Sequence, residues 1–154
     1  MSERARTLAE RFEQANRELI HTVEGLSDAQ WRTTTAGEGW SVAVVAHHVA
    51  GGHQGIAGFV TEIANGKPIS LDMDMINKGN AEHAVQFANA TKGETLALLR
   101  QNGAAAAATV RALGDPQLDL VGGSMGMTAA QVIERILIGH VVDHHGSIRK
   151  AIGA

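Results

Sequence analysis

Four long segments of the chain repeat apolar residues at intervals of three and four positions, and this repeat constrains the fold more than any other feature. An apolar stripe with this period is typical of one face of an α-helix. Helices are expected at about 3–26, 41–65, from 74–80 to 113, and 128–152. Two prolines, Pro68 and Pro116, lie where helical patterns break. No alternating strand pattern is found, so we expect an all-α four-helix bundle without a sheet.

Polar residues at the starts of these segments support the expected boundaries. Ser41 is the expected N-cap of the second helix. Thr128 and Gln131 have capping-box spacing at the start of the fourth helix. Ser27 and Gln30 have the same spacing, which predicts a short extra turn after the first helix.

Composition excludes several classes of function. The 154 residues fit a single domain, 1–154, and the formal charge is −3 without a basic block, so no nucleic-acid partner is expected. The chain has no cysteine, which excludes disulfides, thiolate metal sites and a cysteine nucleophile. No apolar run approaches the roughly 18–20 residues of a membrane span, and the N-terminal segment is charged. We expect a cytoplasmic protein without a membrane partner.

Three of the eight histidines are expected to meet inside the bundle. His140 and His144 lie four residues apart, so they stack on one face of the fourth helix. His48 lies in register with Gly52 and Ile56 on the second helix. A buried imidazole needs partners for both nitrogens, and a metal ion satisfies one nitrogen of each ring. Histidine ligands without cysteine suit zinc, nickel, iron or copper, and three ligands leave a position open for water or substrate.

The remaining histidines are expected to lie outside this cluster. His47 and His145 lie about 100° around their helices from their neighbours, although His145 could still support the site. Asp143 is expected to face another helix or solvent, with a role as a hydrogen-bond acceptor for a ligand left open. No partner is visible in the sequence for His21, His53 and His83, of which the last two are the alternatives if a chosen ligand fails.

Glycines are concentrated in the second helix, where each lowers helix stability by about 1 kcal/mol relative to alanine. This cluster consists of Gly51, Gly52, Gly55 and Gly58. Such a cluster indicates either close packing of the backbone or a cavity wall, and both interpretations stay open. The "GGSMGM" stretch lacks the lysine and the preceding strand of a phosphate loop, so that function is rejected.

Several of these motifs resemble those of the DinB/YfiT-like four-helix bundles. In "GWSVAVVAHHV", His48 follows Trp40 by eight residues, as in that family. The last helix carries His140 and His144 followed by "HGSI", with Ser147 where the family often has glutamine. The stretch "MDMINKGNAEHA" is similar to the family's Asp-x-x-Asn segment, with Asn77 as its asparagine.

The resemblance implies that His48, His140 and His144 hold one divalent metal ion, most often nickel or zinc. Some family members are thiol-S-transferases that use mycothiol or bacillithiol, and a related module is the metal-binding domain of mycothiol-dependent maleylpyruvate isomerase. The resemblance therefore implies that this protein is a metal-dependent thiol-S-transferase, with a low-molecular-weight thiol as cosubstrate and a small molecule as substrate. Catalytic residues and residues that bind the thiol are not identified.

Three alternatives stay open beside this function. The metal site could activate water in a metal-dependent hydrolase, or belong to a non-catalytic, stress-related bundle that binds a metal or ligand. A purely structural bundle with metal-free histidines is the third. Metal binding is expected to fail as pH drops through about 6.5, where imidazole becomes protonated.

The family habit also implies a homodimer. Val44 and Ile138 fall off the inward stripes of their helices. We expect such residues to lie on exposed helix faces that form the dimer interface.

Overall fold

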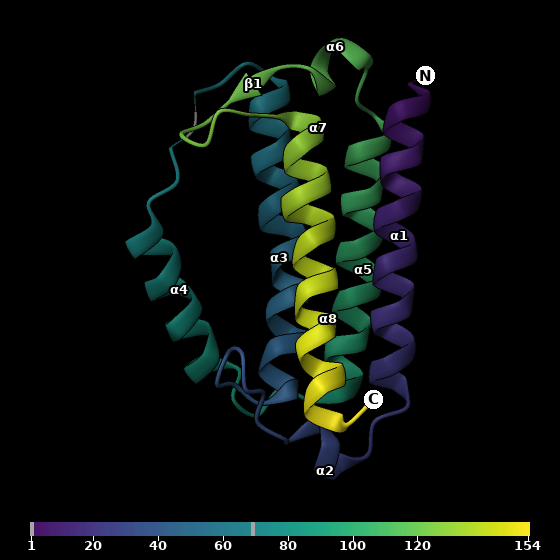
Figure 1. The fold of residues 1–154 in the computed structure, drawn as a ribbon, viewed down its shortest axis with the longest axis vertical. Helices are drawn as coiled ribbons and strands as arrows, with labels where there is room; N and C mark the ends of the chain where they lie inside the picture. Colours follow the sequence, from purple (N-terminus) through teal and green to yellow (C-terminus); the bar gives the residue numbers. More distant parts are fainter. Residues whose placement is uncertain (1, 69) are drawn as a thin grey trace.

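The computed structural model describes residues 2–68 and 70–154, and these form the expected four-helix bundle (Figure 1). The long helices are α1 (Glu3–Glu24), α3 (Val42–Ala64), α5 (Lys92–Arg111) and a last helix that joins α7 (Ala129–Val132), the π-helical segment η1 (Ile133–Ile138) and α8 (Gly139–Ile152). Shorter elements are α2 (Asp28–Trp31), α4 (Met73–Gln86) and α6 (Asp115–Leu118). None of the helices in the described ranges combines the length and hydrophobicity that crossing a membrane requires.

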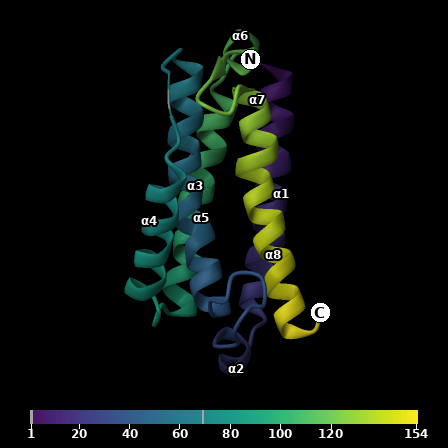
Figure 2. The ribbon, with the colours of Figure 1, turned by 60° about the vertical axis from the view of Figure 1, so that its left-hand side comes forward.

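The helix order includes one crossover. Helices α3 and α5 run in the same direction, because α4 lies outside the bundle and returns the chain to the end where α3 begins (Figures 1 and 2). Helix α1 packs against α5 and the last helix, and α3 packs against the same two from the other side. This arrangement leaves one side of α3 and α8 facing α4 rather than another bundle helix.

The predicted caps are present. The Ser41 hydroxyl accepts a hydrogen bond from the backbone N–H of Val44, and the Thr128 hydroxyl accepts one from Gln131. Thr128 and Gln131 form a complete capping box, as do Ser27 and Gln30 at α2. Side-chain caps satisfy N–H groups that have no partner within the helix, so these residues define where the helices begin.

The prediction of one continuous third helix is wrong. Helix α4 ends at Gln86, and α5 begins at Lys92 with Thr91 as its N-cap. The Thr91 hydroxyl accepts from the backbone N–H of Glu94 at 3.2 Å, and the indole N–H of Trp31 donates to the Ala90 carbonyl at 3.0 Å. The Thr-x-x-Glu capping signal in the sequence marks this break, which lets the chain turn between α4 and α5.

The prediction that no strand forms is also inexact. The linker after α5 contains α6 and a small antiparallel hairpin of β1 (Val121–Gly122) and β2 (Met127–Thr128). Gly123 and Gly126 have φ values of 77° and 64° in its turn, a backbone conformation that glycine adopts without steric cost. The turn glycines, rather than any strand periodicity, produce this hairpin.

The residues chosen for a dimer interface are buried within the chain. Val44 is 4% exposed and Ile138 is 7% exposed, so neither offers a surface to a second copy. Each helix buries a wider arc than its central stripe because it contacts two neighbours. The homodimer stays a prediction that rests on the family resemblance.

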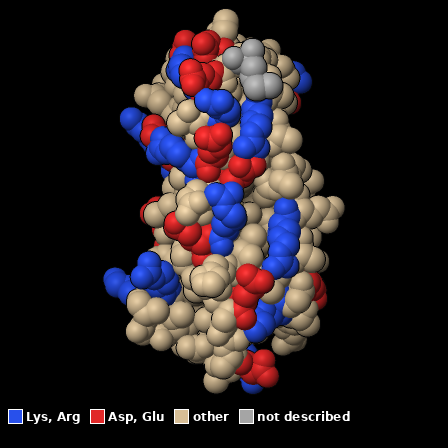
Figure 3. Space-filling model, turned by 90° about the vertical axis from the view of Figure 1, so that its right-hand side faces the viewer, with Lys and Arg blue, Asp and Glu red and all other residues tan. Residues whose placement is uncertain are grey.

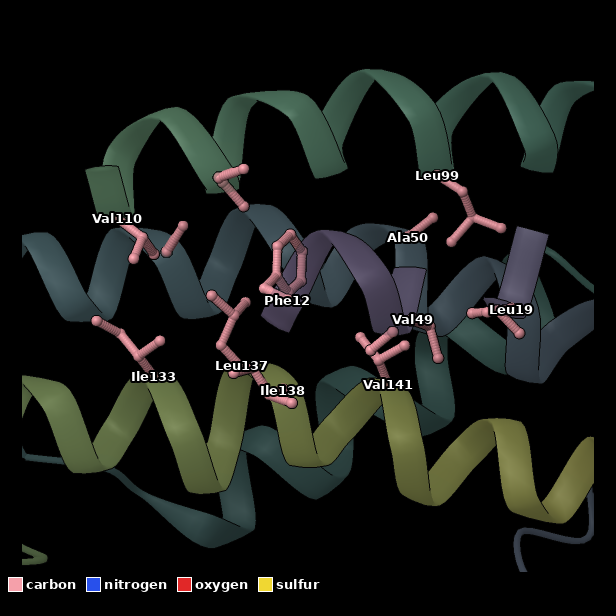
Figure 4. Close-up of a cluster of buried hydrophobic side chains, with 14 of the residues drawn as sticks. Phe12, Leu19, Val49, Ala50, Leu99, Val110, Ile133, Leu137, Ile138 and Val141 are labelled. Carbon is pink, nitrogen blue, oxygen red and sulfur yellow. The ribbon is translucent and has the colours of Figure 1, made fainter. Parts of the chain in front are cut away.

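The core is built from aliphatic side chains of all four long helices, with few aromatic rings (Figure 4). Its fully buried members include Phe12, Leu19, Val49, Leu99, Val110, Ile133, Leu137 and Val141. A polar contact crosses this core, because Asn16 of α1 donates to the Leu99 carbonyl of α5 at 3.0 Å. Its amide oxygen also lies 2.8 Å from Nε2 of His53 on α3. One asparagine therefore ties three helices together.

Gly103 is required for this contact, which gives a first prediction. A Cβ atom at Gly103 would lie 2.3 Å from Nδ2 of Asn16. We expect Gly103→Ala to displace Asn16 and lower the free energy of unfolding by about 1–3 kcal/mol, the cost of a broken buried hydrogen bond. Urea unfolding measures this change. The control is Gly51→Ala, whose Cβ meets no atom within 4 Å and which should stabilise α3 by up to about 1 kcal/mol. Equal effects would contradict the prediction.

Candidate metal site and its cavity

The structure brings together the three histidines chosen from the sequence. His48 on α3 and His140 and His144 on α8 each offer a ring nitrogen, and these atoms lie within 4.8 Å of one another. Nε2 of His140 is 2.9 Å from Nε2 of His48. Tetrahedral ligands at about 2.1 Å from a zinc ion would be about 3.4 Å apart, within about 0.5 Å of this spacing. The donor set and its geometry therefore fit a divalent metal ion.

The three histidines lie beside the hydrophobic core rather than within it. On the last helix the buried stripe is Leu137, Val141 and Ile148, whereas His140 and His144 are half-buried on the adjacent face. On α3, His48 shares its face with Gly52 and Ile56, as expected from the sequence. The site is thus open on one side to a cavity.

The glycine cluster of α3 was expected to reflect either close packing or a cavity wall, and at Gly52 the reason is close packing. A Cβ atom there would lie 2.5 Å from Cε1 and 2.9 Å from Nδ1 of His140. Gly52 therefore permits close packing of the His140 ring against α3. Gly55, one turn further, meets no atom within 4 Å and lines the cavity instead. Both interpretations hold, each for a different glycine.

Glu38 is a residue of the site that the sequence analysis missed. Nδ1 of His144 lies 3.2 Å from Oε1 of Glu38, with side chains 18% and 14% exposed. A histidine that binds metal commonly donates its other ring N–H to a carboxylate, which fixes the ring and raises its basicity. If Nδ1 of His144 donates to Glu38, its Nε2 remains free for a metal ion. Glu38 lies 106 positions from His144, so no local pattern could show this contact.

The Glu38 carboxylate is held in its charged form. Burial alone would raise its pKa, but the hydroxyls of Ser147 and Thr35 and the ring of His144 outweigh burial, and the pKa is lower than usual. Ser147 occupies the position where the family often has glutamine, so this departure places a hydroxyl beside Glu38. Oε2 of Glu38 is buried with no hydrogen-bonding partner among the described residues.

Burial keeps His48 and His140 in their neutral form. It lowers the pKa of His48 to about 4 and that of His140 to about 3, helped in both cases by neighbouring histidines. A neutral ring keeps the lone pair that a metal ion needs. Proton competition at these two rings therefore begins at a lower pH than the expected value of about 6.5.

Four of the other five histidines have side-chain partners outside the group of three. Nδ1 of His47 lies 2.7 Å from Nε2 of His83 on α4, and the His47 ring stacks on Phe87. His145 contacts the Thr22 hydroxyl of α1 at 2.8 Å, so it does not support the metal site. The reserve residue His53 is buried against Asn16, and the other reserve, His83, is paired with His47. Neither belongs to the cluster.

The structure also places two other polar residues named in the sequence analysis. Asp143 is exposed, in agreement with the expectation that it faces another helix or solvent, and the side-chain partner of His144 is Glu38. Asn77, which matches the family's Asp-x-x-Asn segment, is also exposed. The asparagine of α4 that lines the cavity is Asn80, about one helical turn further along.

A cavity of about 580 Å³ adjoins the three histidines. Helices α3 and α8 form two of its walls, and α4 with the segment before it forms a third. Figure 2 shows α4 standing beside α3 on this side of the bundle. A cavity of this size, next to a cluster of potential metal ligands, is typical of a site for a small molecule.

Comparison with known proteins shows the family to which the chain belongs. Residues 12–148 match the family model of the mycothiol maleylpyruvate isomerase N-terminal domain, and the chain belongs to this family. The resemblance expected from the motifs is thereby confirmed. A search of curated proteins gives no significant match.

Solved structures share the fold at low sequence identity. Mycothiol-dependent maleylpyruvate isomerase superposes with a TM-score of 0.74 at 11% identity over 96% of this chain, and a His-to-Ala variant of it with 0.75. This chain spans 63% of that protein's length. YfiT from Bacillus subtilis, described as a probable metal-dependent hydrolase with an unusual four-helix bundle topology, gives 0.71 at 20% identity. That alignment covers 99% of this chain and 90% of YfiT.

Burial of His53 gives a prediction for the pH dependence of stability. Burial lowers its pKa to about 4, whereas an unfolded chain has the ordinary value of 6.5. Neutral His53 therefore contributes stability that is complete above pH 6.5 and is lost as pH falls towards 4. Within that window His53 should account for a slope of about 1.4 kcal/mol per pH unit in the free energy of unfolding.

The comparison variant is His53→Gln, whose amide can still donate to Asn16. Urea unfolding of metal-free protein between pH 4.5 and pH 7, about the window set by the two pKa values, should give a flatter dependence for the variant. Parallel curves would show that His53 binds its proton equally well in both states.

Proposed function

We propose that this protein is a metal-dependent enzyme that acts on small molecules. One divalent ion, nickel or zinc, is held by His48, His140 and His144, and residues 1–154 form one domain with the complete site. The observation that carries this proposal is that three imidazoles converge within 4.8 Å at the wall of a 580 Å³ cavity. The favoured reaction is transfer of a low-molecular-weight thiol, such as mycothiol or bacillithiol, to an electrophile.

The chemistry requires activation of the thiol. An ordinary thiol has a pKa of about 8.5 and is mostly protonated at neutral pH. A bound divalent ion supplies Lewis-acid stabilisation of the thiolate. The protein supplies three fixed imidazoles, a carboxylate that orients His144, and a cavity that holds the electrophile beside them. In the proposed transfer the sulfur forms a bond to the electrophilic carbon, the bond to the leaving group breaks and that group departs with its electron pair (chloride from chlorodinitrobenzene), and the thiol proton goes to Glu38 or to solvent.

A metal-dependent hydrolase is the second candidate, and Glu38 is the observation that favours it. Its buried Oε2 has no hydrogen-bonding partner among the described residues, and its lowered pKa keeps the carboxylate ionised. A carboxylate beside a metal site can remove a proton from an attacking water molecule. Here Glu38 would accept that proton while it also orients His144.

Steady-state assays separate the candidates. Thiol-dependent consumption of an electrophile such as chlorodinitrobenzene, requiring bound metal, would support the transferase. Thiol-independent cleavage of nitrophenyl esters would support the hydrolase. Saturable binding of metal and ligand without any product would identify a non-catalytic binding protein and overturn the proposed enzyme.

Metal content across five variants tests the proposed ligands. His48→Ala, His140→Ala and His144→Ala should each lose most of the bound metal, because two remaining histidines seldom hold an ion at micromolar concentration. His47→Ala and His145→Ala should keep near-normal content, because these rings contact His83 and Thr22 instead. Elemental analysis of the folded proteins after dialysis gives the result. If His47→Ala lost the metal and His48→Ala retained it, His47 rather than His48 would be the ligand on α3.

Glu38→Gln tests the role of the carboxylate. Glutamine keeps an acceptor for His144 but removes the negative charge, so metal affinity should fall by about 10–100-fold. Competition with a chromophoric chelator measures the affinity. The matched control is Glu62→Gln on α3, where the glutamate pairs with Lys67 at 3.1 Å on the surface. Unchanged affinity in Glu38→Gln would remove Glu38 from the metal site.

A further inference from the structure

We infer that the cavity beside the three histidines binds the uncharged, apolar body of a small molecule and discriminates against anions. This inference deepens the proposed function, because it names the substrate class of the same site. It concerns the cavity walls and can be tested with or without a bound metal ion.

The cavity walls are mainly apolar and come from four parts of the chain. Their large side chains are Trp40, Ile56, Phe59, Leu71, Ile76 and Ile136. Away from the histidines, Asn80 is the neutral polar side chain of the described lining. A ligand seated there gains from burial of apolar surface and has one amide with which to align a carbonyl or hydroxyl group.

The described lining contains one charged residue, and its charge is negative. That residue is Glu38, whose carboxylate lies beside His144. The nearest lysine along α4, Lys78, is 78% exposed and lies 4.0 Å from Glu82 on the surface. Many of the chain's charged side chains lie together on the face that α1 lines, with both signs interspersed (Figure 3). An anion in the cavity therefore meets no lysine or arginine among the described lining residues.

Burial of an unpaired anionic group against aliphatic and aromatic walls is unfavourable, because the group loses its hydration. A dicarboxylate such as maleylpyruvate could place one carboxylate beside the histidines. Its second carboxylate would then lie against apolar side chains such as Ile56 and Phe59. The lining thus favours an electrophile with an apolar body over a dicarboxylate.

Two fluorescent probes that share a ring skeleton test this inference. N-phenylnaphthylamine is neutral, and anilinonaphthalene sulfonate carries one added negative charge. We expect the neutral probe to bind at least tenfold more tightly, in both metal-free and metal-loaded protein. Fluorescence titration measures both dissociation constants, and metal content is determined on the same samples.

Two glycine variants locate the bound probe. Gly55→Leu should fill the cavity and weaken the neutral probe at least tenfold, since a Cβ at Gly55 meets no atom within 4 Å and the residue lines the cavity. Gly51→Leu lies one turn earlier on α3, has equal space and does not line the cavity, so binding should be unchanged. Ile76→Lys, which adds a cation to the lining, should improve binding of the sulfonate.

Equal or tighter binding of the sulfonate to the unmodified protein would overturn the inference. Equal effects of the two leucine variants would also overturn it, because the probe would then bind elsewhere. A protein that binds no metal but shows the expected probe selectivity would refute the proposed function and leave the cavity assignment intact.

Discussion

A buried imidazole needs a hydrogen-bonding partner, and the histidines of α3 find theirs on the helices that surround it. Three histidines of that helix point in three directions, and each meets a different part of the fold. His47 contacts His83 of α4, His48 contacts His140 of α8, and His53 contacts Asn16 of α1. Asn16 extends the last contact to the backbone of α5. The site is therefore held by the same polar contacts that set the positions of the helices.

The site combines a polar end and an apolar body within one cavity. Imidazole rings and Glu38 lie at one wall, and aliphatic and aromatic side chains form the others. This division suits the proposed reaction, in which charge develops near the three histidines while the rest of the substrate is excluded from water. Gly52 and Gly55 make the division possible, since one admits the His140 ring and the other leaves room for a ligand.

Helical periodicity was enough to predict the bundle and to select His48, His140 and His144, because residues three or four apart share a helix face. The same argument could not find Glu38, which reaches His144 from a loop far away in the sequence. It also merged α4 with α5, although the Thr91 cap was visible in the sequence. Val44 and Ile138 lie off the central stripes and are nevertheless buried, because a helix with two neighbours buries more than one stripe. Local sequence patterns thus predict which residues share a helix face, whereas loop contacts and helix breaks depend on tertiary structure.

The π-helical segment Ile133–Ile138 directly precedes the pair of histidines on the last helix. A π turn accommodates an extra residue relative to an α turn, so it rotates everything that follows by about 100° about the helix axis. The residues before this segment can therefore face the core in one orientation, while the residues after it are rotated so that His140 and His144 face α3. Deletion of one residue within the segment would restore α-helical winding and re-aim both rings together. In this fold, the direction in which His140 and His144 point thus depends on the winding of one helix, separately from the identity of the two residues.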